Sequence, residues 1–139
     1  MPEPENRIEL LHQLLGPLHM HFKAAKAAYH RYLSNGKSFL FAVSLRRINS
    51  SARQLLLDKG YLLPEERQAD AVALIEHYDV WLTLWDDLAS RGPIAFGEPF
   101  VFENKVNYPR DSEQRLGELY RMLTAAAENV LRTGSGSIG

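Results

Sequence analysis

The sequence predicts an all-α fold, an antiparallel bundle of four to five helices with one long aromatic-rich loop at residues 92–110. Apolar residues recur every three or four positions over long stretches, as they do on one face of an α-helix. Prolines and glycines gather at the boundaries of these stretches. The chain has 139 residues, 45% of them hydrophobic, which suffices for one domain with its own core.

The first helical segment is predicted from about residue 5 to Leu33. Gly16-Pro17 interrupts it, and proline lacks an N–H group and clashes with the preceding turn. Because the apolar stripe keeps its phase across this break, we expect a kinked helix or two nearly collinear ones. The stripe consists of Leu11, Leu15, Leu18, Phe22, Ala25, Tyr29 and Tyr32. Residues 34–37 have the composition of a turn.

Two further helices follow. The second ends near Gly60 and has a stripe of Phe41, Leu45, Ile48, Ala52, Leu55 and Leu56. Pro64 is predicted as the first residue of the third, with Glu65 and Glu66 near its positive end. The apolar arc of this helix is unusually wide, so it is either central in the bundle or part of an oligomer interface. It comprises Ala71, Leu74, Ile75, Tyr78, Val80, Trp81, Leu82, Leu84, Trp85 and Leu88.

Residues 92–110 break the helical pattern, and the partial alternation between Phe100 and Val106 leaves room for a short extended segment. Long loops are uncommon in compact domains and often carry function. We therefore predict that this loop recognises a partner, with capping of the bundle end as the alternative. The predicted anchors are Phe100, Phe102 and Tyr108, with polar contacts from Lys105 and Arg110.

The last helix is predicted to begin with a capping box formed by Asp111 and Gln114. Its stripe comprises Leu116, Leu119, Tyr120, Leu123, Ala127, Val130 and Leu131. The sequence GSGSIG at residues 134–139 predicts a flexible tail, either native or a cloning remnant. The helical domain is accordingly assigned to residues 1–133.

The formal net charge of −1 hides a strong asymmetry between the two halves of the chain. Residues 1–60 carry nine Lys and Arg against four Asp and Glu, whereas residues 61–139 carry seven against thirteen. This asymmetry predicts a surface for a polyanion, or two halves that attract each other within the fold or across a dimer. Ordinary solvated helix faces are the alternative. The predicted basic patch consists of His19, Lys23, Lys26, His30, Arg46, Arg47 and Arg53.

The polar face of the third helix has four carboxylates: Glu76, Asp79, Asp86 and Asp87. They are compatible with a divalent cation, with docking of a basic patch from a second copy, or simply with solvation. On the same helix, His77 flanks the apolar stripe and is predicted to be a hydrogen-bonded boundary residue.

Arg7 and His12 fit the pattern Arg-x4-His, which resembles the active-site motif of the HEPN superfamily of all-helical ribonucleases. The resemblance implies that Arg7 steadies a phosphate and that His12 handles a proton, at a dimer interface where two motifs meet. It covers six residues. It departs from the family at Ile8, where a polar residue is usual, and in its place at the start of the first helix.

Other chemistries find little support. The chain has no cysteine, which excludes disulfides, thiolate zinc sites and cysteine nucleophiles. Glu9 and His12 form half of a di-iron motif, but the second copy is missing. The chain also lacks a phosphate-binding glycine loop. We therefore predict no metal and no cofactor.

Together these features predict a cytoplasmic, non-enzymatic interaction or regulatory module. We expect it to form a homodimer and to act through protein–protein contacts, without a membrane span. The alternative is a HEPN-like, metal-independent ribonuclease or an RNA-binding helical domain that uses Arg7 and His12. Binding of nucleic acid stays open at this point.

Overall fold

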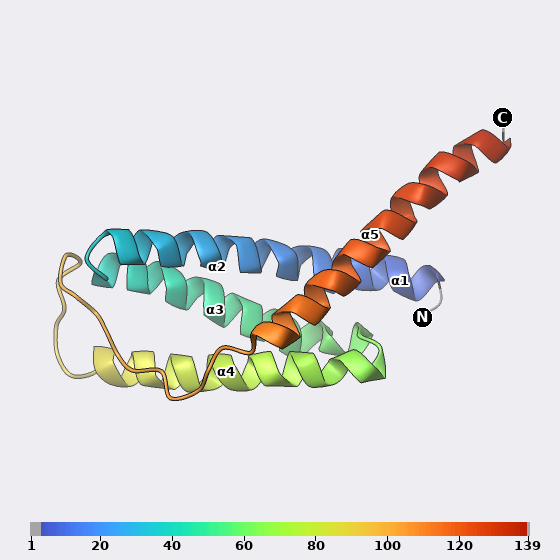
Figure 1. The fold of residues 1–139 in the computed structure, drawn as a ribbon. Helices are drawn as coiled ribbons and strands as arrows, with labels where there is room; N and C mark the ends of the chain where they lie inside the picture. Colours follow the sequence, from blue (N-terminus) through green and yellow to red (C-terminus); the bar gives the residue numbers. More distant parts are fainter. Residues whose placement is uncertain (1–3, 139) are drawn as a thin grey trace.

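The computed structural model describes the backbone of residues 4–138 and the side chains of residues 6–132. The fold is all-α, as the sequence predicts (Figure 1). Its elements in chain order are α1 (Pro4–Leu10), the π-helical turn η1 (Leu11–Leu15), α2 (Gly16–Ser34), α3 (Phe39–Lys59), the 3-10 turn η2 (Gly60–Leu62), α4 (Glu65–Ala89) and α5 (Arg110–Ile138). No described helix combines the length and apolar character that a bilayer crossing requires.

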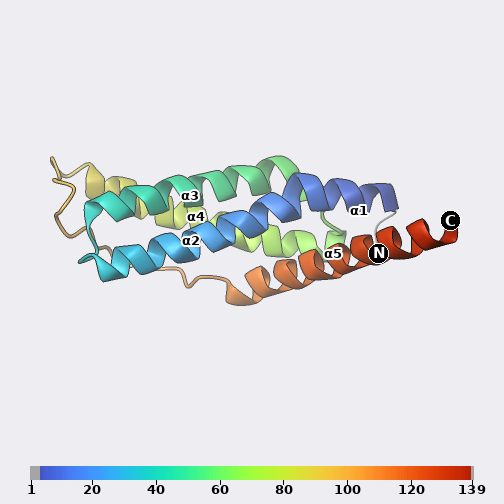
Figure 2. The same ribbon diagram turned by 90° about the horizontal axis from the view of Figure 1, so that it is seen from above.

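The long helices run back and forth along one axis. α2 packs on α3, and α3 packs on α4 (Figure 1). α5 crosses this bundle obliquely over η1, and its C-terminal half extends past the other helices. Figure 2 shows that both chain ends lie at the same end of the molecule. The α2–α3 turn and the loop after α4 lie at the opposite end.

The first helical segment is continuous across Gly16-Pro17, which confirms the collinear arrangement. The Gly16 N–H donates to the carbonyl of Leu11, five residues earlier. This wider π turn places Pro17 at the beginning of α2, where its missing N–H costs little. The helix thus accommodates Pro17 by widening one turn, and it does not end there.

Two apolar clusters hold the bundle together. The larger lies at the α1 end and joins every helix: Leu10, Leu14, Leu15, Leu18, Ala52, Leu56, Leu63, Ala71, Leu74, Tyr78, Leu116 and Leu123. The smaller lies at the loop end and is built on Ala42, Trp85 and Phe100. Helix α4 contributes to both clusters. Within its wide apolar arc Ala71, Leu74, Tyr78 and Trp85 are buried inside the chain, and the other residues of the arc are partly exposed.

The loop after α4 caps the beginning of α3. Ser38, at the N-cap position, makes no capping bond with its side chain. Instead, the Phe39 N–H donates to the Glu98 carbonyl at 2.8 Å, and the Leu40 N–H donates to the Phe96 carbonyl at 3.0 Å. These bonds satisfy two N–H groups that every helix start leaves without an intrahelical acceptor. The predicted extended segment between Phe100 and Val106 is not a strand, and an isolated bridge joins Ser38 to Pro99, just before it.

Three predicted boundaries differ from the structure. Pro64 is the N-cap of α4, one residue before the helix begins. Helix α5 begins at Arg110, so Asp111 already lies in its first turn. The predicted capping box is therefore wrong, because the Pro109 carbonyl accepts the Glu113 N–H and starts the helix earlier. At the other end α5 continues to Ile138, beyond the predicted domain end at 133. Gly139 lies outside the described residues.

The close backbone contact at Gly16 gives a first testable prediction. A Cβ atom there would lie 3.0 Å from the Leu11 carbonyl oxygen, inside the normal contact distance. We expect Gly16→Ala to lower the free energy of unfolding by about 1 kcal/mol, because overpacking outweighs the gain in helix propensity. Urea unfolding followed by circular dichroism measures this change.

Gly117→Ala is the matched control, since a Cβ there meets only the flexible end of Arg121, at 3.4 Å. It should raise stability by up to about 1 kcal/mol through helix propensity. Equal gains in both variants would show that the π turn tolerates a side chain at position 16.

Candidate interaction surfaces

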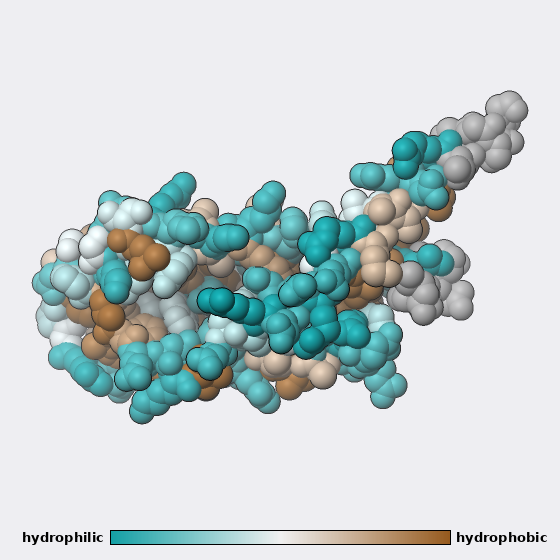
Figure 3. All heavy atoms as spheres, in the orientation of Figure 1, coloured by the Kyte–Doolittle hydropathy of each residue, from teal (hydrophilic) through white to brown (hydrophobic). Residues whose placement is uncertain are grey.

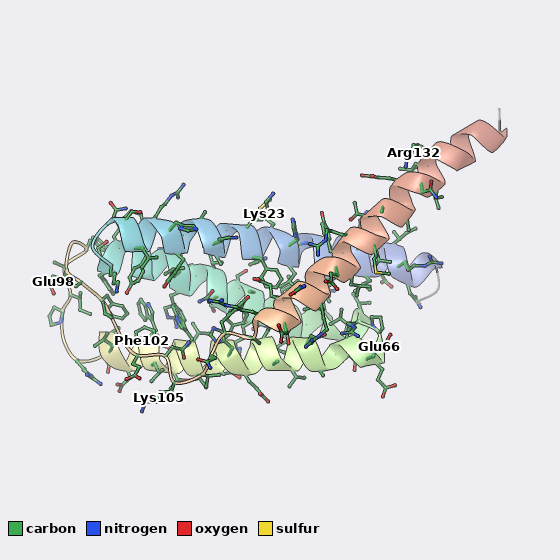
Figure 4. The ribbon with its side chains drawn as sticks, in the orientation of Figure 1. Lys23, Glu66, Glu98, Phe102, Lys105 and Arg132 are labelled. Carbon is green, nitrogen blue, oxygen red and sulfur yellow. The ribbon has the colours of Figure 1, made fainter. Side chains whose placement is uncertain are left out.

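The predicted partner-binding loop is packed onto its own bundle. Phe100 is only 2% exposed, and its ring lies 4.8 Å from that of Trp85, centroid to centroid. Phe102 packs edge-on against Trp81, at 5.6 Å, and Figure 4 shows it beside α4. Phe100 is therefore wrong as a partner anchor, because its apolar surface is already buried within the chain. In this loop, large exposed apolar area remains at Phe96 and Val101 instead.

Tyr108 is also occupied within the fold. Its hydroxyl donates to Glu113 Oε1 at 2.8 Å, and its ring packs edge-on against His77. Lys105 and Arg110 are exposed and make no ion pair within the described part of the chain. The loop's aromatic residues thus mainly cap the bundle end, the alternative that the sequence left open.

The basic patch predicted across α2 and α3 is not one surface. Arg46 forms a two-point ion pair with Asp86, at 2.8 and 3.1 Å, and its guanidinium lies 5.3 Å from the Trp85 ring centroid. Arg53 also pairs across α3 and α4, through one contact from its Nε atom to Asp79. These two arginines are therefore removed from the predicted patch, because their charges are matched within the chain.

The same pairs account for much of the acidic face. Asp79 and Asp86 hold α3, and Asp87 pairs with Arg91 at 2.8 Å. No group of three or more metal-ligating side chains gathers among the described residues. Part of the charge asymmetry is therefore neutralised inside the fold, by ion pairs between the basic helix α3 and the acidic helix α4.

The rest of the basic patch lies on α2 and on the outer side of α3. Lys23, Lys26, His30 and Arg47 are exposed. His19 is half-buried and stacks on Tyr120 of α5, with ring centroids 4.4 Å apart and an interplanar angle of 11°. His19 therefore packs α2 against α5, and it is less available to a partner than its neighbours on α2.

The residues of the Arg-x4-His motif have different environments. His12 is exposed in η1, whereas the Nε atom of Arg7 is buried and makes no hydrogen bond to any described residue. Glu9 accepts a hydrogen bond from Gln13 at 3.1 Å, which occupies the carboxylate of the half di-iron motif. Nothing in these contacts tests the ribonuclease hypothesis, which stays a prediction.

Sequence reasoning missed a buried ionic network between α4 and α5. Asp70 is 4% exposed and accepts hydrogen bonds from Arg67 at 3.1 Å and from Arg115 at 2.9 Å. Burial alone would raise the pKa of Asp70, but hydrogen bonds from Arg115, Ser112 and Arg67 outweigh burial and hold the pKa below its usual value. The sequence feature that could have indicated this network is Asp70 itself, a carboxylate directly before Ala71 of the apolar stripe.

A second cluster lies under the loop around His77, which the sequence predicts at the boundary of the core and which the structure buries. His77 is 5% exposed, and its Nδ1 atom has no hydrogen-bond partner among the described residues. Burial lowers the pKa of His77, and a backbone hydrogen bond with Val106 offsets only part of this effect. Burial raises the pKa of the adjacent Tyr78 to about 12. His77 and Tyr78 are therefore both uncharged near neutral pH.

The C-terminal half of α5 has exposed apolar side chains. Leu116 and Leu123 are buried in the main cluster, but Val130, on the same stripe, is 68% exposed. Met122 beside the stripe is 55% exposed. Figure 3 shows apolar atoms continuing along the projecting part of this helix. The stripe that the sequence assigned to the core therefore extends beyond the core.

Comparisons with known proteins add no relationship. No protein-family model, curated protein or solved structure matches the chain.

The buried histidine predicts a pH dependence of stability. Its folded pKa lies below the value of about 6.5 in an unfolded chain, so the unfolded state binds the proton more readily. The contribution of His77 to the free energy of unfolding should be fully present above about pH 6.5 and should be lost as the pH is lowered toward the folded pKa. Urea unfolding between about pH 7 and 5 should show this loss in the wild type and less of it in His77→Phe.

The lowered pKa of Asp70 acts at lower pH, below about 4, where its own stabilisation is lost. Measurements above pH 5 therefore isolate the histidine. Equal slopes for wild type and His77→Phe would assign the pH dependence to other groups.

Proposed function

We propose that the protein is a non-enzymatic helical interaction module that self-associates through the C-terminal half of α5. The observation that supports this proposal is the regular spacing of the stripe. Apolar residues follow the three-four spacing of a coiled coil through Leu116, Leu119, Leu123, Ala126 and Val130. The first three pack within the chain, whereas Ala126 is half-buried and Val130 is 68% exposed.

The residues beside this stripe favour a second copy as the occupant. In the coiled-coil register the flanking positions are Tyr120, Met122, Ala127 and Asn129, and none of them is charged. Charged flanks select partners by attraction and repulsion, so neutral flanks place no electrostatic penalty on pairing between identical helices. The charged residues of this helix half, Arg121, Glu128 and Arg132, occupy other positions.

The geometry favours an antiparallel pair. Because α5 projects from one end of the bundle, antiparallel pairing leaves the two bundles at opposite ends of the joint helices (Figure 1). Such a pair has the two-fold symmetry of most soluble dimers. Residues 124–138 span only about 22 Å at 1.5 Å per residue. We therefore expect a weak dimer, which the small Ala126 and Ala127 assist by allowing close approach.

The proposal is tested by adding one charge to the stripe. Ala126→Glu places a carboxylate in the middle of the predicted interface, where burial without a partner is costly. We expect the wild type to sediment as a concentration-dependent dimer and Ala126→Glu to sediment as a monomer. Sedimentation velocity from about 5 to 500 μM covers the range expected for a weak contact.

Ala125→Glu is the matched control, since it makes the same change one residue away, on the exposed polar face. It should dimerise like the wild type. A monomeric wild type at the highest concentration, or equal loss of dimer in both variants, would contradict the proposal.

A further inference from the structure

Helix α2, the turn after it and most of α3 form a basic stretch of the chain without acidic residues. Residues 10–57 contain no Asp or Glu but seven Lys and Arg. Arg46 and Arg53 form ion pairs with Asp86 and Asp79 of α4. The remaining five are exposed and make no ion pair with any described residue: Lys23, Lys26, Arg31, Lys37 and Arg47. This surface has positive charge without an internal counter-charge, and it therefore attracts an external anion.

A second copy of the chain does not supply that anion well. On the acidic face of α4, Asp79 and Asp86 are already paired with Arg53 and Arg46, and Asp87 is paired with Arg91. Docking a second basic surface there would break existing ion pairs to form similar ones. The complementary partner is more simply a separate polyanion.

An exposed aromatic side chain lies within the same stretch. Tyr29 is 51% exposed and stacks on Tyr32, with ring centroids 6.2 Å apart. Tyr32 is fixed in turn, because its hydroxyl donates to the Phe100 carbonyl. Tyr29 is thus a supported, solvent-facing ring between Lys26 and Arg31 in the sequence. Basic side chains interleaved with such rings are the usual composition of surfaces that bind single-stranded nucleic acid.

The turn after α2 adds an unusual lysine. Lys37 has a φ of +54°, a conformation that suits Gly or Asn and is unfavourable for a long side chain. Two backbone bonds hold it there: its N–H donates to the Tyr32 carbonyl, and its carbonyl accepts the Phe100 N–H, each at 2.8 Å. Lysine is therefore an unfavourable residue for this backbone conformation. Its charge therefore calls for a role outside the fold.

We propose that α2 and the α2–α3 turn bind single-stranded nucleic acid, with Lys23, Lys26, Arg31 and Lys37 contacting phosphates and Tyr29 stacking on a base. This surface is separate from the α5 stripe. Figure 4 shows Lys23 pointing outward from α2, well away from Arg132 on the projecting part of α5. Binding therefore does not require self-association, and Ala126→Glu should bind like the wild type.

The test is fluorescence anisotropy with a labelled 12-nucleotide single strand of mixed sequence, as RNA and as DNA. Four phosphate contacts predict that log K falls with log salt with a slope of about −3. Lys23→Glu with Lys26→Glu should weaken binding at least tenfold and roughly halve this slope. Equal binding of RNA and DNA supports recognition of phosphate and base, and tighter binding of RNA supports an added contact to the 2′-hydroxyl.

The matched control is Lys105→Glu with Arg132→Glu, which makes the same charge change elsewhere. Figure 4 places Lys105 on the far side of the bundle from Lys23. This control should keep wild-type affinity and slope. Tyr29→Ala should weaken binding about tenfold through lost stacking. Lys37→Asn keeps a residue suited to the backbone and removes the charge, so it should weaken binding while the protein stays at least as stable.

Three results would overturn the proposal. The first is no binding of either strand at 50 mM salt. The second is equal weakening by the control pair, which would make the attraction non-specific. The third is efficient displacement by poly-glutamate together with no effect of Tyr29→Ala, which would identify an acidic polypeptide as the partner.

Discussion

The ionic contact between Asp70 and Arg115 determines where the last helix lies. Asp70 is buried, and an unpaired carboxylate there would cost several kcal/mol. Arg115, from the first turns of α5, and Arg67, one turn before Asp70 on α4, satisfy it together. This requirement fixes the beginning of α5 against α4. The apolar stripe then directs the helix over η1, and the rest of α5 extends past the bundle.

Charge pairing has a comparable effect on the other side of the molecule. The acidic residues of α4 neutralise the α3 arginines that face them, and they leave the outward-facing cations of α2 unmatched. A single electrostatic asymmetry in the sequence therefore serves two purposes. It aligns α3 with α4 inside the domain, and it leaves a positive surface outside. The positions of Arg46 and Lys23 on their helices decide which purpose each serves.

Much of the fold could be predicted from the sequence, because apolar periodicity reports local geometry. The helix stripes follow from it. For the first segment it left a kinked or a collinear arrangement, and for α4 a central position or an oligomer interface. The choice between capping and partner recognition could not be made for the loop, because Phe100 packs on Trp85 of α4 and also on Phe39, about sixty positions earlier in the chain. The burial of Asp70 could not be predicted either, because its carboxylate is stabilised by Arg115, which is forty-five positions later in the chain. The apolar residues of α5 have the same spacing inside and outside the core, so their periodicity alone could not show where burial ends.

The backbone bonds between the loop and the start of α3 also bear on the order of folding. The contacts within α1, η1 and α2 and the packing of α2 on α3 join residues close in sequence, and such contacts form early. By contrast, the bonds from Phe39 and Leu40 to Glu98 and Phe96 close a chain segment of nearly sixty residues. That closure has to wait until α3, its turn and the whole of α4 are assembled. The loop end therefore becomes native later than the packing of α2 on α3, and the first turn of α3 stays uncapped until it does.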